Sequence, residues 1–146
     1  MYKRKLIALA AIAAAACTTA AVAQERPYSE GPVVNVAFIR TVDGKFDEYM
    51  AWVASTWKKE EDAAKKAGYI LGYEVLTIEP RSPDDPDVIL RITYKNWAAL
   101  DGQLEKGDAI AKEIEGSVAN ANKAQADRSK IRRVLGSQTM QVLTLK

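Results

Sequence analysis

The chain has no histidine and only one cysteine, Cys17, among its 146 residues. Without imidazole it has no Ser-His-Asp or Cys-His catalytic site and no haem held by histidine, and one thiol does not make a thiolate zinc site. The sequence also lacks a glycine-rich phosphate loop, a nucleophile elbow and an internal repeat. These absences disfavour an enzyme and restrict any enzyme to metal-independent and haem-independent chemistry. We therefore expect no metal site and no cofactor.

The first 23 residues read as a secretory signal peptide. A basic start, Lys3–Lys5, precedes an apolar run over Leu6–Ala16, and the small-x-small sequence Ala21-Val22-Ala23 stands before Gln24. The apolar run is shorter than the roughly 20 residues that a membrane-spanning helix needs. We therefore expect cleavage after Ala23, a periplasmic or secreted protein, and no transmembrane segment once the signal is removed.

Cys17 offers an alternative, because it follows three alanines as the lipid-bearing cysteine of a bacterial lipoprotein would. Such sites usually carry a larger aliphatic residue three places before the cysteine, where this chain has Ala14. The Ala21–Ala23 site is therefore the favoured one. Prolines 27 and 32 then predict a short extended leader over 24–32 before the folded domain.

The predicted mature chain has 123 residues, the length of one compact domain, which we place at 33–146. The leader carries three basic and no acidic residues, so 18 basic and 19 acidic residues remain, a formal charge of −1. Nucleic-acid binding usually needs a basic surplus on one face, so a nucleic-acid partner is not expected. Without disulfides, stability must come from packing and from association.

Apolar patterning predicts strands, a helix and a hairpin in the first two thirds of the domain. Asp43 is the predicted N-cap of a helix over 44–67 with apolar residues at helical spacing, and Gly68 ends it. The charged residues of that helix, including Glu60 and Glu61, are expected to face solvent. The strands are expected at 33–40, 69–79 and 87–94, with a proline-rich turn at 80–86.

The remaining third is predicted to be a long helical region followed by a strand. Asn96 is a candidate N-cap, and a polar, alanine-rich helix over 119–129 suits an exposed surface or a partner. We expect Gly136 to cap the end of this region and the last strand to cover 138–146. Three apolar residues are expected to dock the helix: Ile131, Val134 and Leu135.

The resulting order, β-α-β-β-α-β, predicts an α+β ferredoxin-like domain with a four-stranded antiparallel sheet and helices on one face. If opposed residue numbers in the hairpin sum to 165, Tyr73 faces Ile92 on the helix side and Glu74 faces Arg91 on the other. Leu76 and Ile89 would then lie on the uncovered face. Two sheets packed face to face would bury them, which predicts a homodimer.

The chain resembles the dimeric α/β-barrel superfamily, which includes antibiotic-biosynthesis monooxygenase-like proteins. The resemblance rests on element order, on Tyr94–Leu100 after the third strand, and on helix aromatics at Phe46, Tyr49, Trp52 and Trp57. It covers roughly residues 33–100 and, more loosely, the last strand. It implies a dimeric barrel whose relatives include cofactor-independent oxygenases and isomerases, but no catalytic motif matches. The segment from Gly107 to Arg133 departs from the superfamily's compact second helix, and its histidine-bound haem members are no model for this chain.

Glu74 and Arg91 are the foremost candidates for a site, since they can bind a polar ligand on the enclosed sheet face or simply form a cross-strand ion pair. If the protein is an enzyme, Glu74 is the candidate base, and Arg91 and Tyr73 are the other candidate catalytic residues. Asn35 and Thr93 are candidate hydrogen-bonding residues in the same space. Trp52 projects away from the apolar stripe, toward a loop, a pocket mouth or the partner subunit, and packing under the C-terminal segment is the favoured interpretation.

Two charged clusters have simpler interpretations. Asp84, Asp85 and Asp87 lack the spacing of a calcium loop and fit a proline-rich turn. A basic patch suits an anion or a membrane surface, but its place at a helix C-terminus already explains it through the helix dipole. The patch consists of Arg128, Lys130, Arg132 and Arg133.

Three functions remain open from the sequence. The leading one is a homodimer that binds a small, partly apolar molecule between its sheets. A metal-free monooxygenase-like or isomerase-like enzyme is the second, and a protein-interaction module that uses the alanine-rich helix is the third.

Overall fold

The computed structural model describes residues 25–146, so the predicted signal peptide and Cys17 lie outside the described residues. These residues form four strands and four α-helices, with a π-helical segment, η1, between α1 and α2 and a short 3₁₀ helix, η2, between β3 and α3. In chain order, the elements are β1 (Tyr28–Thr41), α1 (Phe46–Trp52), η1 (Val53–Trp57), α2 (Lys58–Lys66), β2 (Gly72–Thr77), β3 (Val88–Tyr94), η2 (Trp97–Leu100), α3 (Gln103–Glu115), α4 (Val118–Arg128) and β4 (Arg132–Leu145).

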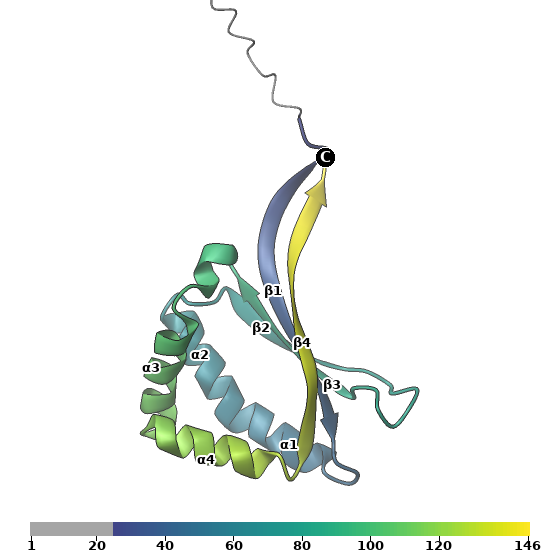
Figure 1. Cartoon of the computed structure of the whole chain (residues 1–146), viewed down its shortest axis with the longest axis vertical. Coiled ribbons are helices and arrows are strands. Elements are labelled where there is room, and N and C mark those ends of the chain that lie inside the picture. The colour runs from purple at the N-terminus through teal and green to yellow at the C-terminus, as the bar shows by residue number, and fades with distance from the viewer. Residues whose placement is uncertain (1–24) are drawn as a thin grey trace, which may run out of the picture.

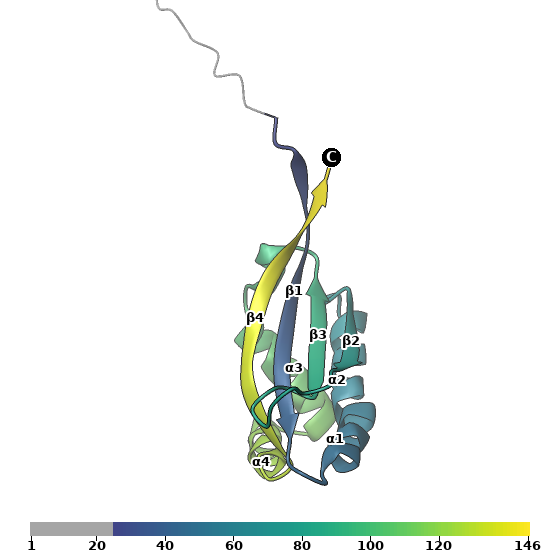
Figure 2. The same ribbon diagram turned by 90° about the vertical axis from the view of Figure 1, so that its right-hand side faces the viewer.

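The strands form one antiparallel sheet in the order β2-β3-β1-β4, which is the ferredoxin-like arrangement that the sequence predicts. The helices lie on one side of this sheet (Figure 1), and Figure 2 looks onto the side that they leave uncovered. No helix among residues 25–146 is both long enough and apolar enough to span a membrane.

The predicted hairpin register is confirmed. Tyr73 pairs with Ile92 and Glu74 with Arg91, so opposed numbers sum to 165 along the whole β2–β3 ladder. This register keeps Val88 and Leu90 of β3 in the core, and a slip of one residue would move both to the uncovered face.

Strands β1 and β4 are longer than predicted and extend beyond β3 as a two-stranded ribbon (Figure 1). Residues 28–32, expected in a leader, belong to β1, with Tyr28 opposite Leu145. Gly136 does not cap a helix, because it lies at a bulge in β4 with φ of +152°. In this strand the glycine instead permits the irregular backbone of the bulge, where β4 has one residue more than β1.

The first long helix is a single rod made of α1, η1 and α2 in succession. Lys45, not the predicted Asp43, is its N-cap, and no side chain caps it. Gly68 follows the helix with φ of +76° and ends it as predicted. The π-helical turn holds Val53 and Trp57, both buried against the sheet.

The second helical region is divided by Gly116, which has φ of +78°, into α3 and α4. Asn96 is the N-cap of η2, as expected, and accepts a hydrogen bond from the Ala99 backbone. Ile131 packs against the core, but Val134 and Leu135 are exposed. The prediction that the latter two dock the helix was wrong, because the chain has already entered β4 at Arg132.

The core lies between the α1–α2 rod and the helix-facing side of β1 and β3. Its fully buried side chains include Ile39, Tyr49 and Val88. At the edge of this core the backbone N–H of Thr41 donates to Asp87 Oδ1 at 2.9 Å, and the Thr41 hydroxyl donates to Asp87 Oδ2. Asp87 therefore joins the end of β1 to the start of β3.

Candidate functional site

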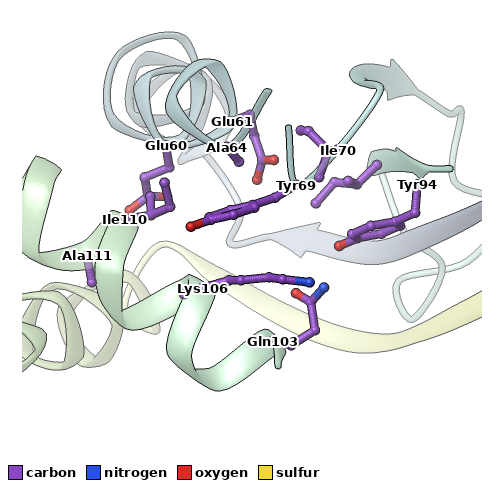
Figure 3. Close-up of a pocket in the computed structure, with 12 residues that line it drawn as sticks. Glu60, Glu61, Ala64, Tyr69, Ile70, Tyr94, Gln103, Lys106, Ile110 and Ala111 are labelled. Carbon is purple, nitrogen blue, oxygen red and sulfur yellow. The ribbon is translucent and has the colours of Figure 1, made fainter. Parts of the chain in front are cut away.

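A cavity of about 290 Å³ lies between α2, α3 and the helix-facing side of β3 (Figure 3). Its walls combine aliphatic and aromatic surface with a few polar groups, as is usual for small-molecule sites. The lining residues are Glu60, Glu61 and Ala64 from α2, Tyr69 and Ile70 from the following turn, Ile92 and Tyr94 from β3, and Gln103, Lys106, Gly107, Ile110 and Ala111 from α3.

Glu61 is the unusual residue of this wall. Its side chain points from α2 into the space lined by Tyr69 (Figure 3), and only 9% of the residue is exposed. No ion pair with a lysine or arginine reaches it within residues 25–146. Burial, and then the negative charge of Glu60, raises the pKa of Glu61 from 4.5 to about 7.

Two neighbouring groups share this low-polarity environment. Burial raises the pKa of Glu60, an effect that Arg128 opposes and Glu115 reinforces. Burial also raises the pKa of Tyr94, with a smaller contribution from the charge of Glu61. The cavity therefore favours neutral over anionic forms of its own acids, so a neutral or weakly polar ligand suits it.

Lys106 shapes the cavity floor without neutralising Glu61. Its Nζ donates to the backbone oxygens of Ala99 at 2.8 Å and Asp101 at 2.5 Å, which anchors α3 to η2. The same ammonium lies 5.7 Å from the ring centroid of Tyr69, within cation–π range. Lys106 thus positions one aromatic wall of the cavity.

A carboxyl group with a pKa near 7 is about half protonated at neutral pH. It can accept a proton from a bound molecule or give one to it, which is the property of a general acid or base. Glu61 therefore gives the cavity both a polar anchor and a group for proton transfer.

The sequence-predicted pair Glu74 and Arg91 is present, on the opposite side of the sheet. Arg91 Nη1 donates to Glu74 Oε2 at 2.5 Å, and both side chains are substantially exposed, with Thr93 on the same face. An exposed ion pair of this kind stabilises a fold by about 1 kcal/mol at most. In the single subunit its role is to join β2 and β3.

The structure does not bring the other predicted site residues to that pair. Tyr73 lies on the helix side, where its hydroxyl donates to Asp62 Oδ1 at 2.7 Å and its ring packs edge-on against Trp57. Within one subunit Tyr73 therefore does not share a site with Glu74 and Arg91, because adjacent strand residues point to opposite faces.

Asn35 also lies on the helix side, since it pairs with Ile92 in the sheet, and its amide donates to Thr139 at 2.9 Å. It cannot share a site with Glu74 across the sheet. Trp52 stacks on Tyr49 with centroids 5.6 Å apart and lies beneath Arg128 of α4. The interpretation of Trp52 as packing under the C-terminal segment is confirmed, and it does not line the cavity.

Sequence reasoning missed Glu61 because it belongs to a run of charged residues. A signal was nevertheless present: Glu61 follows Trp57 by four positions and precedes Ala64 by three, so it continues the apolar stripe of the helix. A carboxylate on an apolar stripe is expected to be buried, with a raised pKa.

Searches against protein-family models and curated protein sequences gave no match. Solved structures that are similar include HapK from Hahella chejuensis, with 14% identity, a TM-score of 0.47, and coverage of 78% of this chain and 95% of that one. Another is protein SO0527 from Shewanella oneidensis, with 20% identity, a TM-score of 0.44, and coverage of 80% and 96%. A dimeric ferredoxin-like protein from an uncultured marine organism has 8% identity, a TM-score of 0.49, and coverage of 80% and 90%.

The ferredoxin-like assignment rests on the chain's own strand order and helix placement. The finer resemblance to antibiotic-biosynthesis monooxygenase-like proteins stays a prediction, since no family model matches.

Proposed function

We propose that this protein is a homodimer in which each subunit binds a small, partly apolar molecule in the cavity between α2, α3 and the sheet. The observation that supports it best is the cavity itself, with Glu61 as a buried polar group on an otherwise largely apolar wall. This proposal places the ligand on the helix side of the sheet, where lining residues from three elements already converge, instead of between two sheets.

The uncovered sheet face supports the dimer. Leu76 is 44% exposed on this face, and Met140 is 42% exposed on the neighbouring part of β4. Half-buried Phe38 and Ile89 lie between them across the sheet. A second copy packed on this face would remove these side chains from water, at roughly 25 cal/mol for each Å² of apolar surface.

We further propose that the leader is removed after Ala23 and that the mature protein works in the periplasm or outside the cell. The basic, apolar and small-residue segments of the first 23 residues support this proposal. N-terminal sequencing of protein recovered from a periplasmic fraction tests it: a chain that begins at Gln24 agrees, and an intact Met1 contradicts it.

Ligand-observed NMR with a panel of small phenols, quinols and aliphatic ketones tests cavity binding. Ala111→Trp is the matched variant, because the larger ring projects into the cavity from α3. At least one compound is expected to bind the wild-type protein and to lose binding in Ala111→Trp while the fold is kept. Equal binding by both proteins would place the ligand elsewhere.

The pKa of Glu61 favours a second candidate function, proton transfer without a cofactor. The carboxylate would take a proton from an activated C–H of the bound molecule and return it, or a solvent proton, to the resulting enolate. Exchange of such C–H groups of a β-diketone in D₂O measures this step. Loss of exchange in Glu61→Gln, with exchange kept in Glu74→Gln, would support the enzyme; no exchange above the rate in buffer would leave a binding protein.

A further inference from the structure

Four polar groups that lack a hydrogen-bond partner lie together where α1, the end of α4 and the start of β4 meet. They are Tyr49 Oη, Trp52 Nε1, Arg128 Nε and Arg132 Nε, and each atom is buried with no partner within residues 25–146. Tyr49 is wholly buried, with 0% of its surface exposed. Each of these groups carries an N–H or O–H, so the cluster offers donors and lacks an acceptor.

Aromatic stacking holds the four side chains in one place. The Arg128 guanidinium lies 4.2 Å from the centroid of the Trp52 ring, and the Arg132 guanidinium lies 6.0 Å from the same ring and 5.7 Å from that of Tyr49. The Tyr49 and Trp52 rings are themselves stacked. Two arginines therefore share one aromatic platform.

The charge of the two arginines is not balanced by an ion pair. In the part of the chain that the structure describes, neither Arg128 nor Arg132 has a carboxylate within 4.0 Å, whereas their sequence neighbours Lys130 and Arg133 pair with Asp127 and Asp84. Burial and the charge of Arg132 lower the pKa of Arg128, and the charges of Glu60 and Glu115 oppose this effect. Asp87, the acid that acts on Tyr49, is already bonded to Thr41.

We propose that Arg128 and Arg132, with Tyr49 and Trp52, form a binding site for a small oxyanion, either a phosphate or a carboxylate group. An oxyanion would supply acceptors to donors that lack them and a negative charge between two unpaired guanidinium groups. This site is separate from the cavity, whose walls carry Glu60 and Glu61 and include none of these four residues.

The helix dipole does not account for this arrangement. Any cation near the last turn of α4 would interact favourably with the helix dipole, whether its side chain is exposed or buried. Instead, the basic patch splits into two kinds: Lys130 and Arg133 are exposed and paired, while Arg128 and Arg132 are half-buried and stacked. The stacked pair keeps two guanidinium groups that no carboxylate of residues 25–146 pairs with, and these groups can bind an anion.

Calorimetric titration with inorganic phosphate and, separately, with acetate tests the site, with sodium chloride at equal ionic strength as the reference. Saturable binding of either anion is expected, and the tighter one identifies the group. Arg132→Gln should weaken it about tenfold to a hundredfold, since a hydrogen bond to a charged group is lost. Arg133→Gln, the exposed neighbour, should bind as the wild type does. No saturable binding, or equal binding in Arg132→Gln, would overturn the proposal.

Tyr49→Phe keeps the test valid if an arginine variant fails to fold. It removes a buried hydroxyl without a partner, so the fold should be as stable as the wild type or more so. Anion binding should nevertheless weaken, and the indole N–H signal of Trp52 should shift on anion addition in the wild-type NMR spectrum. Unchanged anion affinity in Tyr49→Phe together with an unmoved Trp52 signal would show that the cluster is only a packing stack.

Discussion

Arg91 Nη1 donates a hydrogen bond to Glu74 Oε2 at 2.5 Å, across the β2–β3 ladder and toward the β2 edge of the sheet face that the helices leave uncovered. The pair stands beside Ile89 and Leu76 on the same face, so a polar centre is set among apolar side chains. A second copy that covered this face would shield both the apolar surface and the ion pair from water.

The first prediction concerns this face. Leu76→Lys should shift the protein from dimer to monomer, because a buried ammonium without a partner is costly to desolvate. Sedimentation velocity measures the change. Leu104→Lys is the matched control: Leu104 is 82% exposed on α3 and should leave the dimer intact. A wild-type monomer, or a Leu76→Lys variant as dimeric as the wild type, would contradict the proposed interface.

The second prediction concerns the pH dependence of stability. The pKa of Glu61 is higher in the folded protein, about 7, than in the unfolded chain, about 4.5. The folded state therefore holds this proton more tightly, so the stabilising contribution is complete below pH 4.5, declines as the pH rises, and is lost above about pH 7.

Glu61→Gln removes this decline, since the amide does not ionise. At pH 8 the variant should be more stable than the wild type by roughly 1–3 kcal/mol, and the difference should shrink toward pH 4. Urea unfolding at several pH values measures it. Glu113→Gln, an exposed change on α3, should reproduce the wild-type profile. A Glu61→Gln variant whose stability parallels that of the wild type at every pH would show that Glu61 is not buried as described.

The third prediction concerns the link between β1 and β3. Asp87→Ala should destabilise the fold by about 1–3 kcal/mol, because it leaves the buried N–H and hydroxyl of Thr41 without acceptors. Thermal unfolding followed by circular dichroism measures this loss. Asp84→Ala, which removes an exposed carboxylate paired with Arg133, should change stability by less than about 0.5 kcal/mol. If the two variants destabilise the fold equally, the hydrogen bonds from Thr41 to Asp87 stabilise it no more than an exposed ion pair does.

The hairpin register was predictable because Val88 and Leu90, two residues apart in β3, must both face the helices. The ends of β1 and β4 were not predictable from the sequence. Gly31, Pro32 and Gly136 are typical breakers, yet here they lie at or beside bulges that let paired strands continue. A bulge depends on the neighbouring strand, so local sequence does not reveal it.

The candidate site was less predictable than the fold. The sequence did not show on which face of the sheet Asn35 lies. Strand β1 is apolar on both faces, so its pattern does not distinguish the helix side from the uncovered side. Glu61 has the spacing of a core residue but the chemistry of a surface residue, and only the packing of α3 over α2 decides between them. The cavity is formed by three elements whose relative positions no local pattern specifies.

Native mass spectrometry of the mature protein, purified from the cells that naturally produce it, tests the central claim most directly. The wild type should appear as a dimer that carries extra mass from a bound small molecule. The Ala111→Trp variant should remain a dimer without that mass. A wild-type protein without bound small molecules, or equal bound mass in the two proteins, would contradict a ligand held between α2, α3 and the sheet.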